Sequence, residues 1–169
     1  MTWSRWKIAG LLFIIGGALA ILASLLGLAG APAVAGVLGV IGLLLEGAGF
    51  ILFGLDFGRV RVRRWVPWLY VIAGVLMLVT ALLGLVGGSL GGAALVVQLA
   101  IAALILVASI LLLSVRGADS VLCIALIVLG AFLVLAAFFS NIVVALIIGA
   151  LYIVIGLLLW GVRFGRSRP

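Results

Sequence analysis

The sequence predicts an all-α, polytopic membrane protein, with a single transmembrane domain of six spanning helices over residues 1–169. Two observations support this fold class. First, 69% of the 169 residues are hydrophobic and only 8% are charged, whereas an average soluble domain is about 45–50% apolar and about 25% charged. Because so few charges cannot cover a water-soluble fold, lipid must surround most of the chain. Second, the apolar residues form six runs, each close to the ~20 residues that a spanning helix needs.

The six apolar runs are separated by short connections that are either rich in glycine or charged. The first run follows two basic residues and is similar in that respect to a signal peptide. Its apolar part, Ile8–Leu28, is longer than the core of a signal peptide, which has about 7–15 residues. We therefore expect an uncleaved first helix. The predicted spans are residues 6–26, 34–55, 65–84, 93–115, 120–138 and 142–162.

The basic residues predict the orientation of the helices. All 10 Lys and Arg residues lie before or at the start of the first helix, between the second and third, between the fourth and fifth, or after the sixth. The other three connections carry no charge. The positive-inside rule assigns short loops rich in Lys and Arg to the cytoplasm. We therefore expect a multi-pass protein of the cell (inner) membrane with both termini in the cytoplasm.

Small residues recur at matching positions of the predicted helices. The series are Gly10/Gly17, Pro67/Gly74 and Cys123/Gly130 in the odd-numbered helices, and Gly42/Gly49, Ala102/Ser109 and Gly149/Gly156 in the even-numbered ones. Residues seven apart lie within about 20° on a helix, so each series forms a narrow groove. In lipid, such grooves let helix backbones approach closely. We predict three tandem helical hairpins, about 6–58, 65–116 and 120–163, related by a pseudo-threefold axis along the membrane normal.

The first two predicted hairpins share short apolar motifs, a Trp near the start and then an Ile-x-Gly step, and the second predicted helix of the chain also has an acidic residue followed by Gly. The residues are Trp6, Gly10, Ile15, Gly17, Glu46, Gly47, Trp65, Ile72 and Gly74. Together with the three short hairpins, these motifs resemble the HdeD-like family of small six-helix bacterial and archaeal membrane proteins, named for a member linked to acid resistance. The third hairpin lacks the Trp and the acidic step. The resemblance implies a membrane role in stress tolerance and no defined catalytic activity.

The residue types that most enzymes use for catalysis are scarce in this sequence. It contains no His, which excludes Ser-His and Cys-His pairs, imidazole metal sites and bis-His haem. The three carboxylates are scattered, and the glycine-rich stretches lack the Lys-Ser/Thr ending of a phosphate-binding loop. The one cysteine, Cys123, excludes an internal disulfide and is expected to be a small buried residue. We therefore expect a non-enzymatic protein without a cofactor or a metal.

Glu46 is the one acidic residue expected deep in the membrane. It lies four residues after Gly42 and three before Gly49, so it faces the packed side of its helix. It is about 15 Å from the end of that helix at 1.5 Å per residue. An ionisable residue at such a depth marks a functional site by default. The simpler interpretation, which the sequence favours, is a neutral Glu46 that locks two helices by a hydrogen bond to Tyr152 or Gln98.

Basic residues in the second connection predict contacts with membrane lipids. They are Arg59, Arg61, Arg63 and Arg64. Each basic side chain near an anionic leaflet contributes about 1 kcal/mol to binding, and the same residues also fix the topology. Binding of nucleic acid is not expected, because the basic residues lie only at the ends of apolar runs. The sequence leaves open an undefined role in membrane or acid-stress tolerance, a proton or small-solute pathway using Glu46, and an accessory subunit of a larger membrane complex or homo-oligomer.

Overall fold

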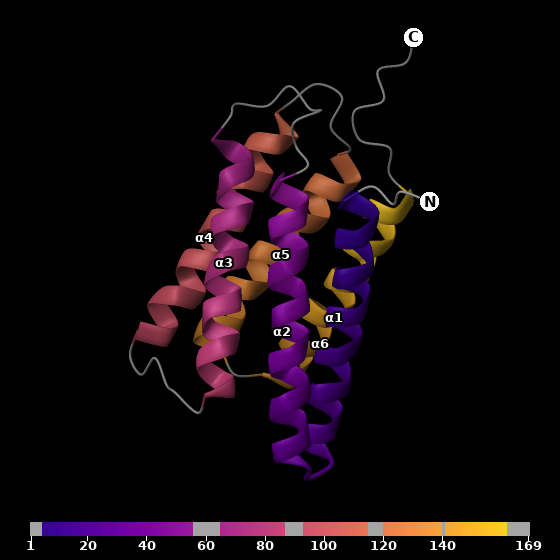
Figure 1. Ribbon diagram of the computed structural model, residues 1–169, viewed down its shortest axis with the longest axis vertical. Coiled ribbons are helices and arrows are strands. Elements are labelled where there is room, and N and C mark those ends of the chain that lie inside the picture. The colour runs from indigo at the N-terminus through magenta and orange to yellow at the C-terminus, as the bar shows by residue number, and fades with distance from the viewer. Residues whose placement is uncertain (1–4, 56–64, 87–92, 115–119, 140, 162–169) are drawn as a thin grey trace.

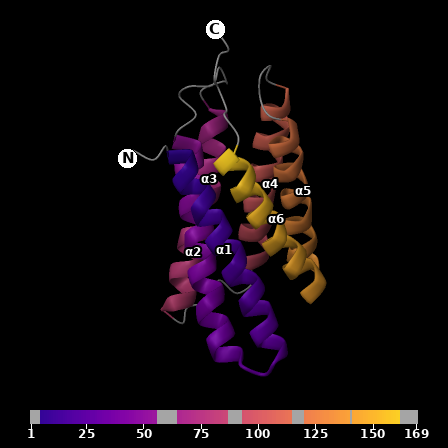
Figure 2. The same cartoon turned by 90° about the vertical axis from the view of Figure 1, so that its right-hand side faces the viewer.

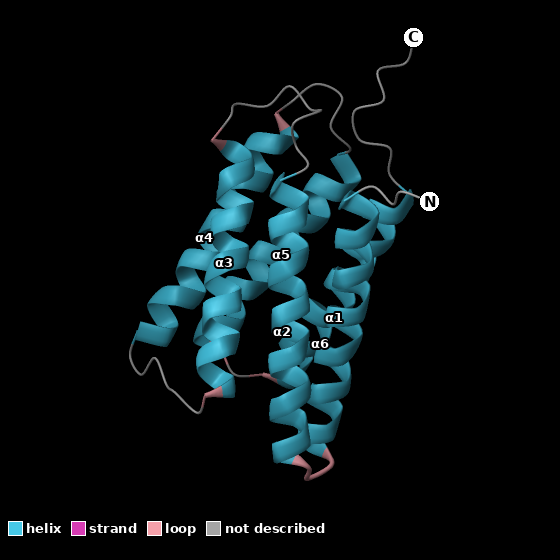
Figure 3. Ribbon diagram, viewed as in Figure 1, coloured by secondary structure: helices cyan, strands magenta, loops and turns pink. Residues whose placement is uncertain are grey.

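The computed structural model describes residues 5–55, 65–86, 93–114, 120–139 and 141–161, and all regular structure in these ranges is α-helical (Figure 3). Six helices are present, and each is long and apolar enough to cross a membrane, which confirms the predicted fold class at this level. They are α1 (Arg5–Leu28), α2 (Pro32–Leu55), α3 (Val66–Leu85), α4 (Ala93–Leu113), α5 (Ser120–Phe138) and α6 (Ile142–Gly161).

The helix ends follow from local residue chemistry. Between α1 and α2, Gly30 has a φ of +88°, a conformation that glycine adopts without the steric cost of a Cβ. The α2 helix begins at Pro32, two residues earlier than predicted, because proline is well suited to a first helical turn. Pro67 likewise lies in the first turn of α3, as its second residue. The α6 helix follows Asn141, whose Oδ1 accepts a hydrogen bond of 3.0 Å from the backbone N–H of Val143.

The helices run alternately in opposite directions, and each packs against the next, with α6 closing back on α1 (Figures 1 and 2). The contacts are not equal around this ring. They are most extensive for α1 with α2, α1 with α6 and α2 with α3, and least extensive for α3 with α4 and α5 with α6. The hairpins predicted from the sequence therefore do not pack alike, and the three-hairpin repeat stays a prediction.

Glycines set the closest approaches in the extensively packed part of the ring. A Cβ added at Gly17 of α1 would lie 2.6 Å from the carbonyl oxygen of Gly149 of α6, a separation that real Cβ atoms do not show. Between α3 and α2, a Cβ added at Gly74 would lie 2.5 Å from the carbonyl oxygen of Gly47. We call these two contacts the glycine seams. The α4–α5 contact differs, because Gly130 of α5 faces the Leu106 side chain instead of a glycine.

The small residues that the sequence assigned to helix packing occupy buried positions at these contacts. They are Gly17, Gly42, Gly49, Gly74, Gly130, Gly149 and Gly156. Gly42 lies against Gly16 of α1, and a Cβ added at either residue would be 3.1 Å from the carbonyl oxygen of the other. Because these glycines let backbones touch, dispersion contacts between helices can form in lipid, where no hydrophobic force drives helices together.

Candidate functional site

The interior of the bundle contains a cluster of buried aromatic rings, which we call the aromatic core. Its members are Phe13 of α1, Phe50 and Phe53 of α2, Tyr70 of α3 and Tyr152 of α6, and none is more than 1% exposed. Phe50 is central: its ring centroid lies 4.8 Å from that of Phe13 and 6.1 Å from those of Tyr70 and Tyr152. Edge-to-face and offset contacts at such distances are favourable for aromatic rings. The aromatic core therefore ties four helices together.

Glu46 lies beside the aromatic core, one helical turn before Phe50 on α2. Its side chain is 5% exposed, so the acid is inside the protein. Gly16 of α1 leaves room for it: a Cβ added at Gly16 would lie 2.8 Å from Cγ of Glu46. Gly49, on the next turn, likewise leaves room for the Phe13 ring, which a Cβ added there would approach at 3.0 Å. The glycines of α1 and α2 thus create the space in which an acid and an aromatic ring are buried together.

The hydrogen bond predicted between Glu46 and Tyr152 is not formed. Tyr152 is 1% exposed, and within the described ranges its hydroxyl has no hydrogen-bond partner. No hydrogen bond or ion pair of the Glu46 side chain is found in the described part of the chain either. The two side chains nevertheless lie close together, against the adjacent residues Gly16 and Gly17 of α1. A buried polar group without a partner costs about 1–3 kcal/mol, so the lack of a direct bond in this pair is unfavourable.

Gln98, the second predicted partner of Glu46, is exposed on α4. The prediction that Gln98 lies on the packed face is therefore wrong. It rested on the four-residue spacing from Ala102, which is fully buried. Near the beginning of α4 the neighbouring residues Leu95 and Val96 are also exposed, so this end of the helix has less protein around it than its middle. Wheel position alone cannot reveal that.

A second polar pair, which the sequence argument missed, joins α3 to α4. The hydroxyl groups of Tyr70 and Ser109 are 2.8 Å apart and both side chains are fully buried. The Ser109 hydroxyl also donates a hydrogen bond of 2.6 Å to the backbone carbonyl of Ile105. The signal was present in the sequence, because Tyr70 lies four residues before Gly74 and so shares its groove. Cys123 of α5 is buried, as expected, and within electrostatic range of Tyr70.

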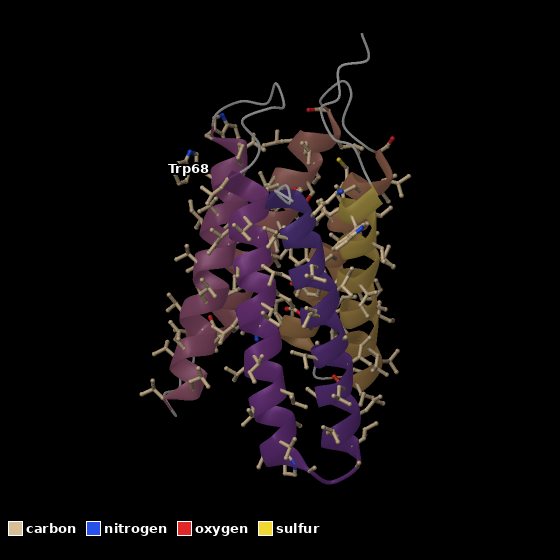
Figure 4. All side chains as sticks on the ribbon, turned by 45° about the vertical axis from the view of Figure 1, so that its right-hand side comes forward. Trp68 is labelled. Atoms are coloured by element: carbon tan, nitrogen blue, oxygen red, sulfur yellow. The ribbon has the colours of Figure 1, made fainter. Side chains whose placement is uncertain are left out.

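The end of the bundle where α1 begins and α6 ends carries exposed tryptophans. Trp65 and Trp68 at the start of α3 are 48% and 57% exposed, and Trp160 near the end of α6 is 39% exposed. Figure 4 shows Trp68 on the outside of the bundle. Along the middle of the helices, by contrast, the outward side chains are almost all carbon (Figure 4). Tryptophan is enriched where a membrane meets water. The predicted lipid-binding residues Arg59, Arg61, Arg63 and Arg64 lie outside the described residues.

The comparisons with known proteins leave the family open. No protein-family model matches the chain, and neither does any curated protein or any solved structure. Within the described ranges, no three His, Cys, Asp or Glu side chains are grouped closely enough to hold a metal ion. The interior acid and its surroundings are therefore the features from which a function can be argued.

Proposed function

We propose that this chain is a non-enzymatic protein of the cell membrane that contributes to tolerance of acid or other membrane stress, in the manner implied by its resemblance to the HdeD-like family. The observation that carries the proposal is that the described interior consists of close helix packing around one buried acid, Glu46. An ionisable residue kept inside a membrane bundle is costly, which favours a role for it beyond packing.

The proposal includes a topology and a repeat. Both termini are cytoplasmic, the basic connections contact anionic headgroups, and the three hairpins are tandem copies. Support comes from the 10 basic residues, which lie only in alternate connections and near the two ends of the sequence, and from Gly17, Gly74 and Gly130, which are buried at matching positions of α1, α3 and α5. Reporter fusions at Gly30, Gly88 and Asn141 should report the external side. Fusions after Pro169 should report the cytoplasm, and an external C-terminus would refute this topology.

A survival assay in the native host tests the stress role. Deleting the gene should lower survival after acid challenge, and a plasmid copy of the wild-type chain should restore it. A plasmid copy of Glu46→Gln, expressed at the same level in the membrane, separates a packing role from a titrating role. Equal survival of deleted and complemented cells under acid and membrane-disrupting conditions would refute the proposal.

A second candidate function is a proton pathway that uses Glu46. It is favoured by the finding that neither Glu46 nor Tyr152 has a hydrogen-bond partner among the described residues, because a purely structural acid would be expected to bond its neighbour. Purified protein in liposomes should then dissipate an imposed pH gradient faster than empty liposomes. Glu46→Gln should abolish that rate, because an amide cannot titrate. Equal rates for the two proteins would exclude the pathway.

A further inference from the structure

The pair formed by Glu46 and Tyr152 has a feature that neither helix packing nor the aromatic core explains. Both side chains are buried, on different helices, and each carries a polar group without a direct partner in the described structure. We propose that Glu46 and Tyr152 form a proton-binding site in which one buried water molecule bridges the carboxyl group and the phenol hydroxyl. This site would be the proton-binding step of the second candidate function, the proton pathway. The proposal rests on that function only for the movement of a proton through the bundle.

The placement of the two groups fits a bridge. Both side chains pack against adjacent residues of α1, since a Cβ added at Gly16 would lie 2.8 Å from Cγ of Glu46 and one added at Gly17 would lie 2.9 Å from Cβ of Tyr152, yet the Tyr152 hydroxyl makes no hydrogen bond to Glu46. A water molecule that accepts from one group and donates to the other links two such groups, and bridging waters are nearly as favourable as direct hydrogen bonds. Buried waters in proteins typically satisfy polar groups that otherwise have no partner.

The surroundings hold both groups in place. The stem of Glu46 packs over Gly16 of α1, and the Tyr152 ring stacks on Phe13 of the same helix with centroids 5.8 Å apart. The Gly17–Gly149 contact fixes α6 against α1 one turn from Tyr152. Because α1 contacts both residues, it holds the acid and the hydroxyl as neighbours.

The chemistry of the two side chains suits both protonation states of the acid. A neutral carboxyl group donates its O–H to the water, which in turn donates to the Tyr152 oxygen. An ionised carboxylate accepts from the water, which accepts from the Tyr152 O–H. The hydrogen bonds reverse direction, and the water links the two side chains in either state. Phenylalanine at position 152 could do neither, whereas it would pack equally well in the aromatic core.

Unfolding measurements on single and double variants test the bridge. Tyr152→Phe should lower the melting temperature by about 2–4 °C, the shift that one lost hydrogen bond produces in a chain of this length. In the Glu46→Gln background, Tyr152→Phe should change the melting temperature by a different amount, because the two residues share the water. If Tyr152 truly has no partner, Tyr152→Phe removes an unsatisfied hydroxyl and raises the melting temperature, which would overturn the proposal.

Tyr70→Phe is the matched control, because it deletes a tyrosine hydroxyl from the same core that bonds directly to Ser109. Its effect on stability should add to that of Glu46→Gln without coupling. Infrared spectroscopy gives an independent measurement. The carbonyl band of protonated Glu46, identified by its loss in Glu46→Gln, should shift to higher frequency in Tyr152→Phe and stay unchanged in Tyr70→Phe. An unshifted band in Tyr152→Phe would refute the bridge, whereas a shifted band with no proton flux in liposomes would refute only the pathway.

Discussion

The two glycine seams and the α4–α5 contact are alternative solutions to the same packing problem. At matching positions of α1, α3 and α5, Gly17 and Gly74 face glycine backbones, whereas Gly130 faces the Leu106 side chain. Where glycine meets glycine, the helices make extensive contact, and these contacts join α6, α1, α2 and α3 in that order. The α4–α5 pair joins these four helices through the two least extensive contacts in the ring. The most extensive helix contacts are thus those in which glycine faces glycine.

The largest expected effect comes from adding a methyl group at a glycine seam. Gly17→Ala would place its Cβ 2.6 Å from the carbonyl oxygen of Gly149, and backbone cannot move aside without separating α1 from α6. Overpacking of this kind lowers the free energy of unfolding by about 1–3 kcal/mol. We expect a loss at the upper end of this range. The free energy of unfolding, measured by titration with a denaturing detergent, checks this value.

Gly130→Ala is the matching change in the α4–α5 contact. Its Cβ would lie 2.6 Å from Cγ of Leu106, but a side chain can change rotamer where a backbone cannot. We expect a cost of about 1 kcal/mol or less, since the higher helix propensity of alanine offsets part of the strain. A cost as large as that of Gly17→Ala would show that the two contacts are equally rigid and that the comparison is wrong.

The rate of thiol labelling compares local opening of the two regions. Cys123 of α5 is fully buried, and so is Ala9 of α1. Ala9 directly precedes Gly10, which matches Cys123 in the predicted repeat. We expect Cys123 to react with a membrane-permeant maleimide about tenfold faster than Ala9→Cys in a Cys123→Ala background, because less packing holds α5 closed. Each labelling rate is divided by the rate of the same thiol in denatured protein. Similar corrected rates for Cys123 and Ala9→Cys would contradict the difference in packing.

The Tyr70–Ser109 hydrogen bond is the polar link between α3 and α4 in the described structure. Tyr70→Phe should lower the free energy of unfolding by about 0.5–1.5 kcal/mol, and it should raise the rate of Cys123 labelling because the α4–α5 pair loses an attachment. Ser109 keeps its bond to the Ile105 carbonyl, so no hydroxyl is left without a partner. An unchanged labelling rate would show that apolar contacts alone hold the pair.

The smallest effect is expected at a glycine outside any contact. Gly36 of α2 is exposed, and a Cβ added there meets nothing within 4 Å. Gly36→Ala should be neutral or should stabilise the protein by up to about 1 kcal/mol through helix propensity. A clear loss of stability, measured in the same detergent titration, would reveal a contact of this face with a partner helix, as expected of a homo-oligomer or an accessory subunit.

By itself, the sequence determined that the chain forms six apolar helices, and it placed Glu46 in the interior. Run length and composition suffice for the helices because a backbone in lipid must satisfy its own hydrogen bonds. The seven-residue spacing sufficed for Glu46 because the helical wheel fixes which side a residue occupies. The same spacing pointed to Gly17, Gly74 and Gly130 as groove positions.

Only the tertiary structure decided which groove meets which helix and which polar groups touch. The wheel made both Tyr152 and Gln98 candidate partners of Glu46, yet Gln98 is exposed and Tyr152 makes no direct bond. The Tyr70–Ser109 bond joins residues 39 positions apart in the chain, and no local pattern encodes such a distance. Rotation and depth of one helix relative to another depend on the whole set of side chains between them. For that reason Gly130 meets the Leu106 side chain across the α4–α5 contact, while Gly17 and Gly74, at matching positions, meet glycine backbones.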